Sequence, residues 1–206
     1  GETGSVTFIG TVSPAGGNLK EPVTESTKKA ARCFYALSQN RADSKRYPAI
    51  DTLDSYSKYL EYPEFIEFAK EKLDENWVEL VNEARNILVR GKEMEEQINI
   101  LGDDSVPIDY HVTLWKSEFV DFVILQQDAF DKIDATTSLE RQEYMLKKVI
   151  NVTRSEFKFE GFEEVGTYFK RLINVFRQMN YTIFKSEEFH KVEEEANAVL
   201  EERIIK

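Results

Sequence analysis

The chain has 206 residues, with 27 Lys and Arg against 38 Asp and Glu, so its formal net charge is −11. Hydrophobic residues make up 41% and charged residues 32%, a balance that allows a packed core in one domain or two small ones and excludes a disordered chain. The acidic balance argues against nucleic acid and anionic membranes as partners. The sequence has no apolar run of about 18 residues, so we expect no membrane insertion, and the single cysteine, Cys33, excludes an intramolecular disulfide framework and indicates a reducing compartment.

The first predicted element is a strand at Ser5–Val12, because the segment is short and β-branched and is followed by the breaker cluster Ser13–Asn18. From Pro22 to about Gln39 we expect a helix, capped by Thr24 or Ser26. Its apolar residues stand at helical spacing: Ala30, Ala31, Phe34 and Leu37.

After Asp51 almost everything is predicted to be helical. Pro63 stands where a helix can begin, and an apolar stripe then runs from Phe65 to Leu88. A break at Gly102–Pro107 separates this region from a helix around Phe119. Three further helices are expected, the first with a Thr137–Glu140 capping box and the last with a Ser186 cap.

We therefore predict a mainly α fold in two parts. Residues 61–206 form a helical bundle, and the part before it, residues 1–60, contains the predicted strand and helix. No fixed-period repeat is present.

The sequence offers little catalytic chemistry. It contains neither G-x-x-x-x-G-K-[ST] nor G-x-G-x-x-G, and its two histidines, His111 and His190, lack the partners of a zinc site. We expect Cys33 to act as a small buried hydrophobic residue rather than as a reactive thiol. We expect Asp51 and Asp54 to cap backbone amides rather than to act as a pair of acid–base carboxylates. No catalytic residue and no metal ligand is predicted.

Two segments resemble the catalytic A subunit of V-type and A-type rotary ATPases. They are Gly4–Thr24, which contains Ser-Pro-Ala-Gly-Gly, and Arg46–Ser57, which contains Tyr-Pro-Ala-Ile-Asp. The likeness continues through Leu125–Phe130 and Ser138–Glu140. Gly16 and Gly17 distinguish this family, because its relatives carry an acidic pair there.

The resemblance implies that residues 1–60 are the last strand and helix of a P-loop (RecA-like) α/β nucleotide-binding domain, and that residues 61–206 are the C-terminal helical domain. The phosphate-binding lysine, the Mg²⁺ ligand and the glutamate that activates water would lie upstream of Gly1. ATP or ADP with Mg²⁺ is then expected in the full-length subunit, and no cofactor or ATPase activity in this piece alone.

The resemblance also assigns an adenine-binding role to Tyr47, Phe130 and Gln127. The residue before Pro48 is biased towards an extended backbone, and stacking between two aromatic rings is worth on the order of 1–3 kcal/mol. The family more often has Phe where Tyr47 stands and often has a second aromatic where Ile124 stands. The alternative for Tyr47 and Phe130 is ordinary core packing.

Asp103 and Asp104 occupy the place of the acidic loop that meets the central rotor in the family; a solvated turn is the alternative. The implied partners are B subunits in an alternating hexameric ring and central-stalk subunits, in a cytoplasmic head peripheral to the membrane that couples ATP turnover to H⁺ or Na⁺ transport. The rival hypotheses are a non-catalytic helical interaction module and the related B subunit.

Overall fold

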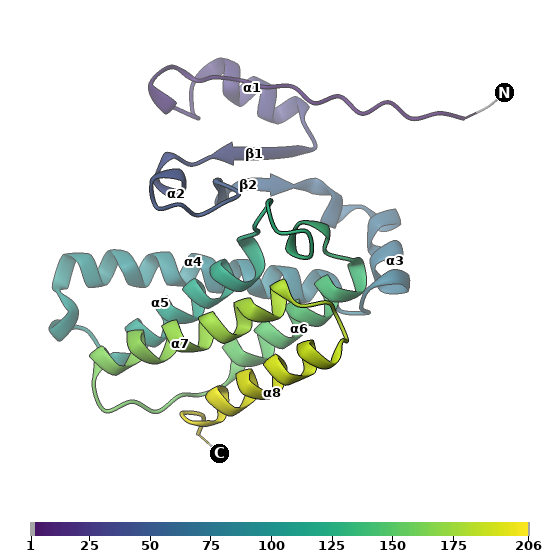
Figure 1. Cartoon of the computed structure of the whole chain (residues 1–206). Helices are drawn as coiled ribbons and strands as arrows, with labels where there is room; N and C mark the ends of the chain where they lie inside the picture. Colours follow the sequence, from purple (N-terminus) through teal and green to yellow (C-terminus); the bar gives the residue numbers. More distant parts are fainter. Residues whose placement is uncertain (1–2, 206) are drawn as a thin grey trace.

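The computed structural model describes residues 3–205 and has a small sheet layer above a helical bundle (Figure 1). The upper layer contains α1 (Pro22–Ala30), β1 (Cys33–Leu37), α2 (Gln39–Asp43) and β2 (Ile50–Ser57). The bundle contains α3 (Pro63–Lys72), α4 (Trp77–Leu101), α5 (Ile108–Val120), α6 (Leu139–Arg154), α7 (Phe162–Tyr181) and α8 (Glu187–Glu201). The prediction of a mainly α fold is confirmed.

The predicted strand at Ser5–Val12 is wrong, because this segment has no regular secondary structure. It runs alone away from the sheet layer in Figure 1, and Val6, Phe8 and Ile9 are exposed. A strand needs neighbours for its backbone amides and carbonyls, and within residues 3–205 the sheet has two strands, neither of them this segment.

The predicted helix over Pro22–Gln39 is wrong in its second half. Helix α1 ends at Ala30, and Ala31 has extended dihedral angles (φ −86°, ψ 144°). Residues Cys33–Leu37 form β1, which pairs antiparallel with β2. The aromatic residues after Cys33 favour a pleated strand, and pairing with a strand some 20 residues further on outweighs the helical spacing of the apolar residues.

Two helices, α1 and α6, begin at a different capping residue from the one predicted. Helix α1 is capped by the Glu21 side chain, which accepts from the Thr24 amide at 3.1 Å, rather than by Thr24 or Ser26. Helix α6 is capped by Ser138 and not by Thr137. The predicted Ser186 cap of α8 is confirmed, since its Oγ accepts from the Phe189 amide at 3.1 Å. An Ncap oxygen satisfies one of the free amides of the first helical turn.

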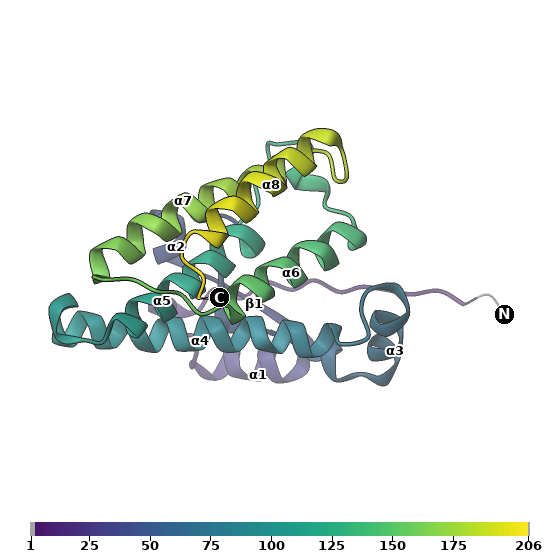
Figure 2. The same cartoon turned by 90° about the horizontal axis from the view of Figure 1, so that it is seen from below.

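The bundle core lies between α5, α6, α7 and α8. Figure 2 shows α4 running the length of the bundle, with α5 beside it. In α7 the fully buried residues recur at helical spacing and form one face towards α5 and α8. They are Val165, Phe169, Leu172, Phe176 and Met179.

Helices α4 and α5 lie in close contact at Gly91. A Cβ placed on Gly91 would lie 2.1 Å from the Cβ of Ser117, a distance that real atoms do not reach. Glycine therefore sets how close the two helices lie.

Helix α5 continues into a π-helical segment, Asp121–Leu125, which carries the chain from the bundle towards the sheet layer. The Val123 carbonyl in this segment accepts from Nδ2 of Asn180 in α7 at 2.8 Å. Single π turns inside α-helices are frequent at functional sites.

Candidate functional site

Tyr47 lies in the connection between α2 and β2, next to the loop that follows α5. The backbone amide of Gln127 donates to the carbonyl oxygen of Tyr47 at 3.0 Å. The Tyr47 hydroxyl reaches the carbonyl oxygen of Ala42 at 3.4 Å, and the side chain is exposed. The structure thus brings together two of the three residues of the predicted adenine set and leaves the tyrosine ring open to solvent.

Phe130 lies in the same loop as Gln127, three residues further on, and its side chain is 100% exposed. Its amide donates to Oδ1 of Asp128 at 2.9 Å, a local turn that fixes the backbone and leaves the ring free. The Tyr47 and Phe130 rings are not among the aromatic pairs found in residues 3–205. Core packing, the alternative for both rings, is contradicted by this exposure.

The loop that carries Phe130 is organised by the buried residue Asp134. Its Oδ2 accepts from the Asp128 amide at 2.6 Å, and its carbonyl oxygen accepts from Nε2 of Gln127 at 2.6 Å. Burial raises the pKa of the Asp134 carboxyl, while the Asp128 amide and the charge of Arg141 oppose that rise. The Gln127 side chain is therefore engaged within the loop.

Four charged side chains join the Tyr47 segment to α5 and the π segment. Arg46 NH1 and NH2 donate to the two carboxylate oxygens of Glu118 at 3.0 and 2.7 Å, and NH1 also reaches Oδ2 of Asp121 at 3.0 Å. Arg41 NH1 donates to Oδ1 of Asp121 at 2.8 Å. The hydrogen bond to Glu118, opposed by burial, raises the pKa of Arg46 above its ordinary value. Sequence reasoning missed these four residues, and the only signal was the position of Arg46 beside Tyr47.

A cavity of about 340 Å³ adjoins these charges, between the α2–β2 connection and helices α4 and α5. Its lining includes Arg41, Arg46, Glu118 and Asp121. The wall is mostly polar, so the junction between the sheet layer and the bundle is not a continuous apolar core.

Asp103 and Asp104 begin the short 3₁₀ turn between α4 and α5, at the end of the bundle. Both are exposed, as are Ile100 and Leu101 just before them. The buried side chain of His111 in α5 contacts this turn, because its Nε2 donates to the Asp103 carbonyl oxygen at 3.2 Å.

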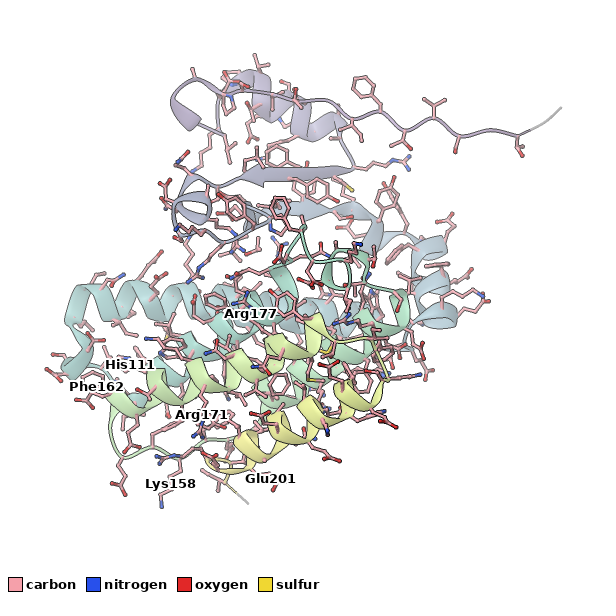
Figure 3. The ribbon with its side chains drawn as sticks, in the orientation of Figure 1. His111, Lys158, Phe162, Arg171, Arg177 and Glu201 are labelled. Carbon is pink, nitrogen blue, oxygen red and sulfur yellow. The ribbon has the colours of Figure 1, made fainter. Side chains whose placement is uncertain are left out.

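The His111 ring stacks on Phe162 of α7, with the ring centroids 5.1 Å apart; Figure 3 labels the two residues side by side. His111 thus has a packing role, as expected for a histidine without ligand partners. His190 is exposed and lies 3.4 Å from Oε2 of Glu193. Within the described part of the chain, no group of three His, Cys, Asp or Glu side chains is arranged to hold a metal ion.

The two other candidate residues, Cys33 and Asp51, make contacts within the fold. Cys33 is partly buried in β1, and its Sγ donates to Oγ of Ser57 at 3.3 Å. The Asp51 carboxylate accepts from the amides of Leu53 and Asp54, at 2.9 and 2.8 Å, so it stabilises a local turn. Over residues 3–205 no helix is both long and apolar enough to cross a membrane.

Comparison with known proteins gives matches over nearly the whole chain. Residues 1–57 match the family described as ATP synthase alpha/beta family, nucleotide-binding domain, and residues 66–160 match the C-terminal domain of V and A type ATP synthase. The V-type ATP synthase alpha chain of Borrelia duttonii is 40% identical over 193 residues, which are 94% of this chain and 31% of that protein. The alpha chain of Protochlamydia amoebophila is 36% identical over 206 residues, which are 98% of this chain and 34% of that protein.

A solved structure described as a unique ATP synthase subunit NeqB from Nanoarcheaum equitans is similar in fold, with a TM-score of 0.52 at 20% identity. The matched region covers 68% of this chain and 32% of the chain in that structure. The chain thus spans about a third of the length of these relatives.

The relatives named here as alpha chains favour this subunit over the rival hypotheses of a helical interaction module or a B subunit. The first part of the chain, residues 1–57, matches a nucleotide-binding domain. With one region matching the nucleotide-binding domain and the next matching the C-terminal domain, the chain belongs to the family of V-type and A-type ATP synthase alpha chains.

Proposed function

We propose that this chain supplies the adenine-facing wall and a rotor-facing lever to the catalytic alpha chain (A subunit) of a rotary ATPase or ATP synthase. In the whole complex, ATP turnover would drive transport of H⁺ or Na⁺. The observation that carries the adenine role is the placement of Phe130, fully exposed on a loop whose backbone is bound to Tyr47 through Gln127.

An exposed aromatic ring on a tightly hydrogen-bonded loop is available to a planar ligand. The Asp134 contacts hold the loop without using the Phe130 ring, and Tyr47 also keeps about half of its surface open. A base stacked on such rings gains on the order of 1–3 kcal/mol with little discrimination between bases. The engaged Gln127 side chain assigns that residue a positioning role through its backbone amide, rather than a direct contact with the base.

The described residues do not supply the phosphate end of the nucleotide. The sequence has no G-x-x-x-x-G-K-[ST] motif, and the described carboxylates do not gather into a cation site. We therefore place the Mg²⁺ and phosphate ligands in other parts of the alpha chain, and we expect the present chain alone to lack ATPase activity.

The rotor-facing role is proposed for Asp103 and Asp104. They lie at the end of the α4–α5 hairpin, exposed and beside the apolar side chains of Ile100 and Leu101. An acidic tip of this kind is attracted to a basic surface on a central-stalk subunit. The stacked His111–Phe162 pair supports the tip against the bundle, so a movement of the bundle would move the tip.

The same proposal places the boundary between the nucleotide-binding domain (1–60) and the helical domain (61–206) near residue 60. The family matches that end at residue 57 and begin at residue 66 support this position. On the basis of family membership we also propose B subunits alternating in a hexameric ring and central-stalk subunits as partners, and a cytoplasmic position peripheral to the membrane.

The adenine role is tested by photolabelling the complete alpha chain, assembled with its partners, with 2-azido-ADP. We expect the labelled peptides to contain Tyr47 or Phe130, and labelling at Tyr47 to fall in the Tyr47→Phe variant relative to Phe130. Label confined to peptides outside residues 47 and 127–130 would reject the role.

The rotor role is tested by reversing the charges of Asp103 and Asp104 to Lys and measuring torque at low salt, where surface charges are least screened. A matched control reverses Glu194 and Glu195, exposed acids of α8, to Lys. We expect the tip variant to lose torque or coupling and the control to keep it; equal torque in both variants would contradict the role.

A further inference from the structure

The four-residue charge cluster formed by Arg41, Arg46, Glu118 and Asp121 holds two cations and two anions in one place. Asp121 is the most deeply buried member, with 6% of its side chain exposed, and Arg41 keeps 14%. The two arginines come from α2 and the connection after it, and the two carboxylates come from the end of α5 and the start of the π segment. The cluster therefore joins segments more than 70 residues apart in sequence.

Arg46 contacts more side chains of this region than Arg41 does. Its guanidinium forms a two-pronged pair with Glu118, reaches Asp121 with the same NH1, and lies over the Phe122 ring, 4.7 Å from its centroid. A planar fork with a stacked face is satisfied in one orientation only, and a lysine ammonium cannot reproduce it.

On one side the cluster is connected directly to Tyr47. Arg46 is its neighbour in the chain, and the Arg46 amide donates to the Arg41 carbonyl oxygen at 2.8 Å. Lys45, between them, has a left-handed backbone (φ 57°), so the turn that leads into Tyr47 is tightly specified.

On the other side the cluster is connected to the loop that carries Phe130. The Asp121 carbonyl oxygen accepts from the Gln126 amide at 3.0 Å, and the next amide, of Gln127, donates to the Tyr47 carbonyl oxygen. The contacts therefore form a closed circuit: Asp121 to Gln126, along the chain to Gln127, across to Tyr47, back along the chain to Arg46, and across to Asp121.

Such a circuit controls geometry more than it adds stability. Removing charged groups from water costs free energy that their attraction roughly offsets, so well-packed apolar residues often stabilise a protein as much as an ion cluster does. The best-attested role of such buried ion pairs is to specify one register between two segments.

We propose that Arg46, paired with Glu118 and Asp121, is a positioning residue that fixes the placement of Tyr47 relative to the Phe130 loop. On the proposed adenine role, on which this rests, the ion cluster sets the separation between the Tyr47 and Phe130 segments. The cluster acts through Tyr47 and the Gln127 amide and does not touch the nucleotide itself.

The geometry is tested first without nucleotide, on the 206-residue chain. In a Cys33→Ser background, spin labels are attached at Asp43→Cys and Ala129→Cys, both exposed positions. Double electron–electron resonance then measures the distance between the end of α2 and the Phe130 loop. The test variants are Arg46→Met and the milder Glu118→Gln. Arg154→Met is the matched control, because Arg154 makes a similar fork with Glu83 away from the cluster.

We expect the distance distribution to shift or broaden in the Arg46→Met and Glu118→Gln variants and to stay unchanged in Arg154→Met. Arg46→Lys should restore it only in part. The exchanged pair Arg46→Glu with Glu118→Arg should lie closer to the native distribution than Arg46→Glu alone. If Arg46→Met fails to fold, as judged by circular dichroism, Glu118→Gln decides the question. A native distribution in a folded Arg46→Met or Glu118→Gln variant would overturn the positioning role.

A second measurement, the affinity of the complete alpha chain for ADP, separates this inference from the proposed function. If Arg46 acts through Tyr47, Arg46→Met weakens ADP binding, and the Arg46→Met, Tyr47→Ala double variant is weakened no more than Tyr47→Ala alone. Full additivity of the two losses would overturn action through Tyr47. Unchanged affinity in Tyr47→Ala, together with a shifted spin-label distance in Arg46→Met, would reject the adenine role while supporting the positioning of the segment by Arg46.

Discussion

The amide of Gln127 donates a hydrogen bond to the carbonyl oxygen of Tyr47 across 3.0 Å, joining residues 80 positions apart. This bond attaches the turn after α2 to the loop after α5, and so connects the sheet layer with the helical bundle. The aromatic rings that the two segments carry, Tyr47 and Phe130, are both exposed.

We expect the Phe130 ring to contribute to ligand binding and not to folding. Because the side chain is fully exposed, Phe130→Ala should change the free energy of unfolding by no more than about 0.5 kcal/mol. Phe176→Ala, at a fully buried site of α7, should cost about 3–5 kcal/mol. Urea unfolding followed by circular dichroism compares the two variants. A loss above about 2 kcal/mol in Phe130→Ala would place the ring in the core instead.

The crossing of α4 and α5 depends on Gly91. A Cβ there would collide with the Cβ and Oγ of Ser117, so Gly91→Ala should lower the free energy of unfolding by about 1–3 kcal/mol, even though alanine favours a helix. Removing the Ser117 side chain opens the space, and the Gly91→Ala, Ser117→Gly pair should be more stable than the sum of the two single losses predicts. Additive losses in thermal or urea unfolding would show that the helices do not collide at this point.

Asp134 organises the Phe130 loop through its carboxylate and its backbone. Asp134→Ala removes the carboxylate that accepts from the Asp128 amide in a part-buried hydrogen bond, and should cost about 1–3 kcal/mol. Asp134→Asn retains an oxygen for that amide and should cost less. Amide hydrogen exchange at Asp128 gives a local readout. Protection of that amide in Asp134→Ala equal to the wild type would contradict the assignment.

The same carboxyl predicts a pH dependence. Burial raises its pKa in the folded state above the ordinary value of 3.8, so the folded chain holds this proton more tightly than the unfolded chain does. The contribution of Asp134 to stability is therefore present in full below the unfolded-state pKa and is lost as pH rises through the folded-state pKa. Relative to Asp134→Asn, the wild type should lose stability as pH increases across this window. A difference that stays constant or grows would contradict the direction of the shift.

The helices of the bundle were predictable because each carries its own signal. The apolar periodicity of α7 and the Ser186 cap of α8 are local features of the sequence. Strand β1 was mispredicted as helix, because Phe34 and Leu37 fit a helical spacing and the pairing of Cys33 with Ser57 is not visible locally. The segment Ser5–Val12 has β-branched residues but no neighbouring strand among the described residues, so its local preference does not produce a strand.

The candidate site was predictable only in part. Tyr47, Gln127 and Phe130 came from the resemblance to the rotary ATPase family, whereas Glu118 and Asp121 have no local signal. Glu118 at the end of α5 and Asp121 at the start of the π segment are three residues apart, a spacing typical of an ordinary polar helix face. Their pairing with Arg46, across more than 70 residues, is a consequence of the tertiary fold.

The affinity for ADP of the complete alpha chain, assembled with its partner subunits, tests the central claim most directly. Tyr47→Ala and Phe130→Ala should each weaken binding of a fluorescent ADP analogue by roughly 5-fold to 150-fold, the equivalent of about 1–3 kcal/mol of lost stacking. Tyr47→Phe, which keeps the ring, should bind like the wild type. Wild-type affinity in both alanine variants would contradict the assignment of this junction to the adenine site.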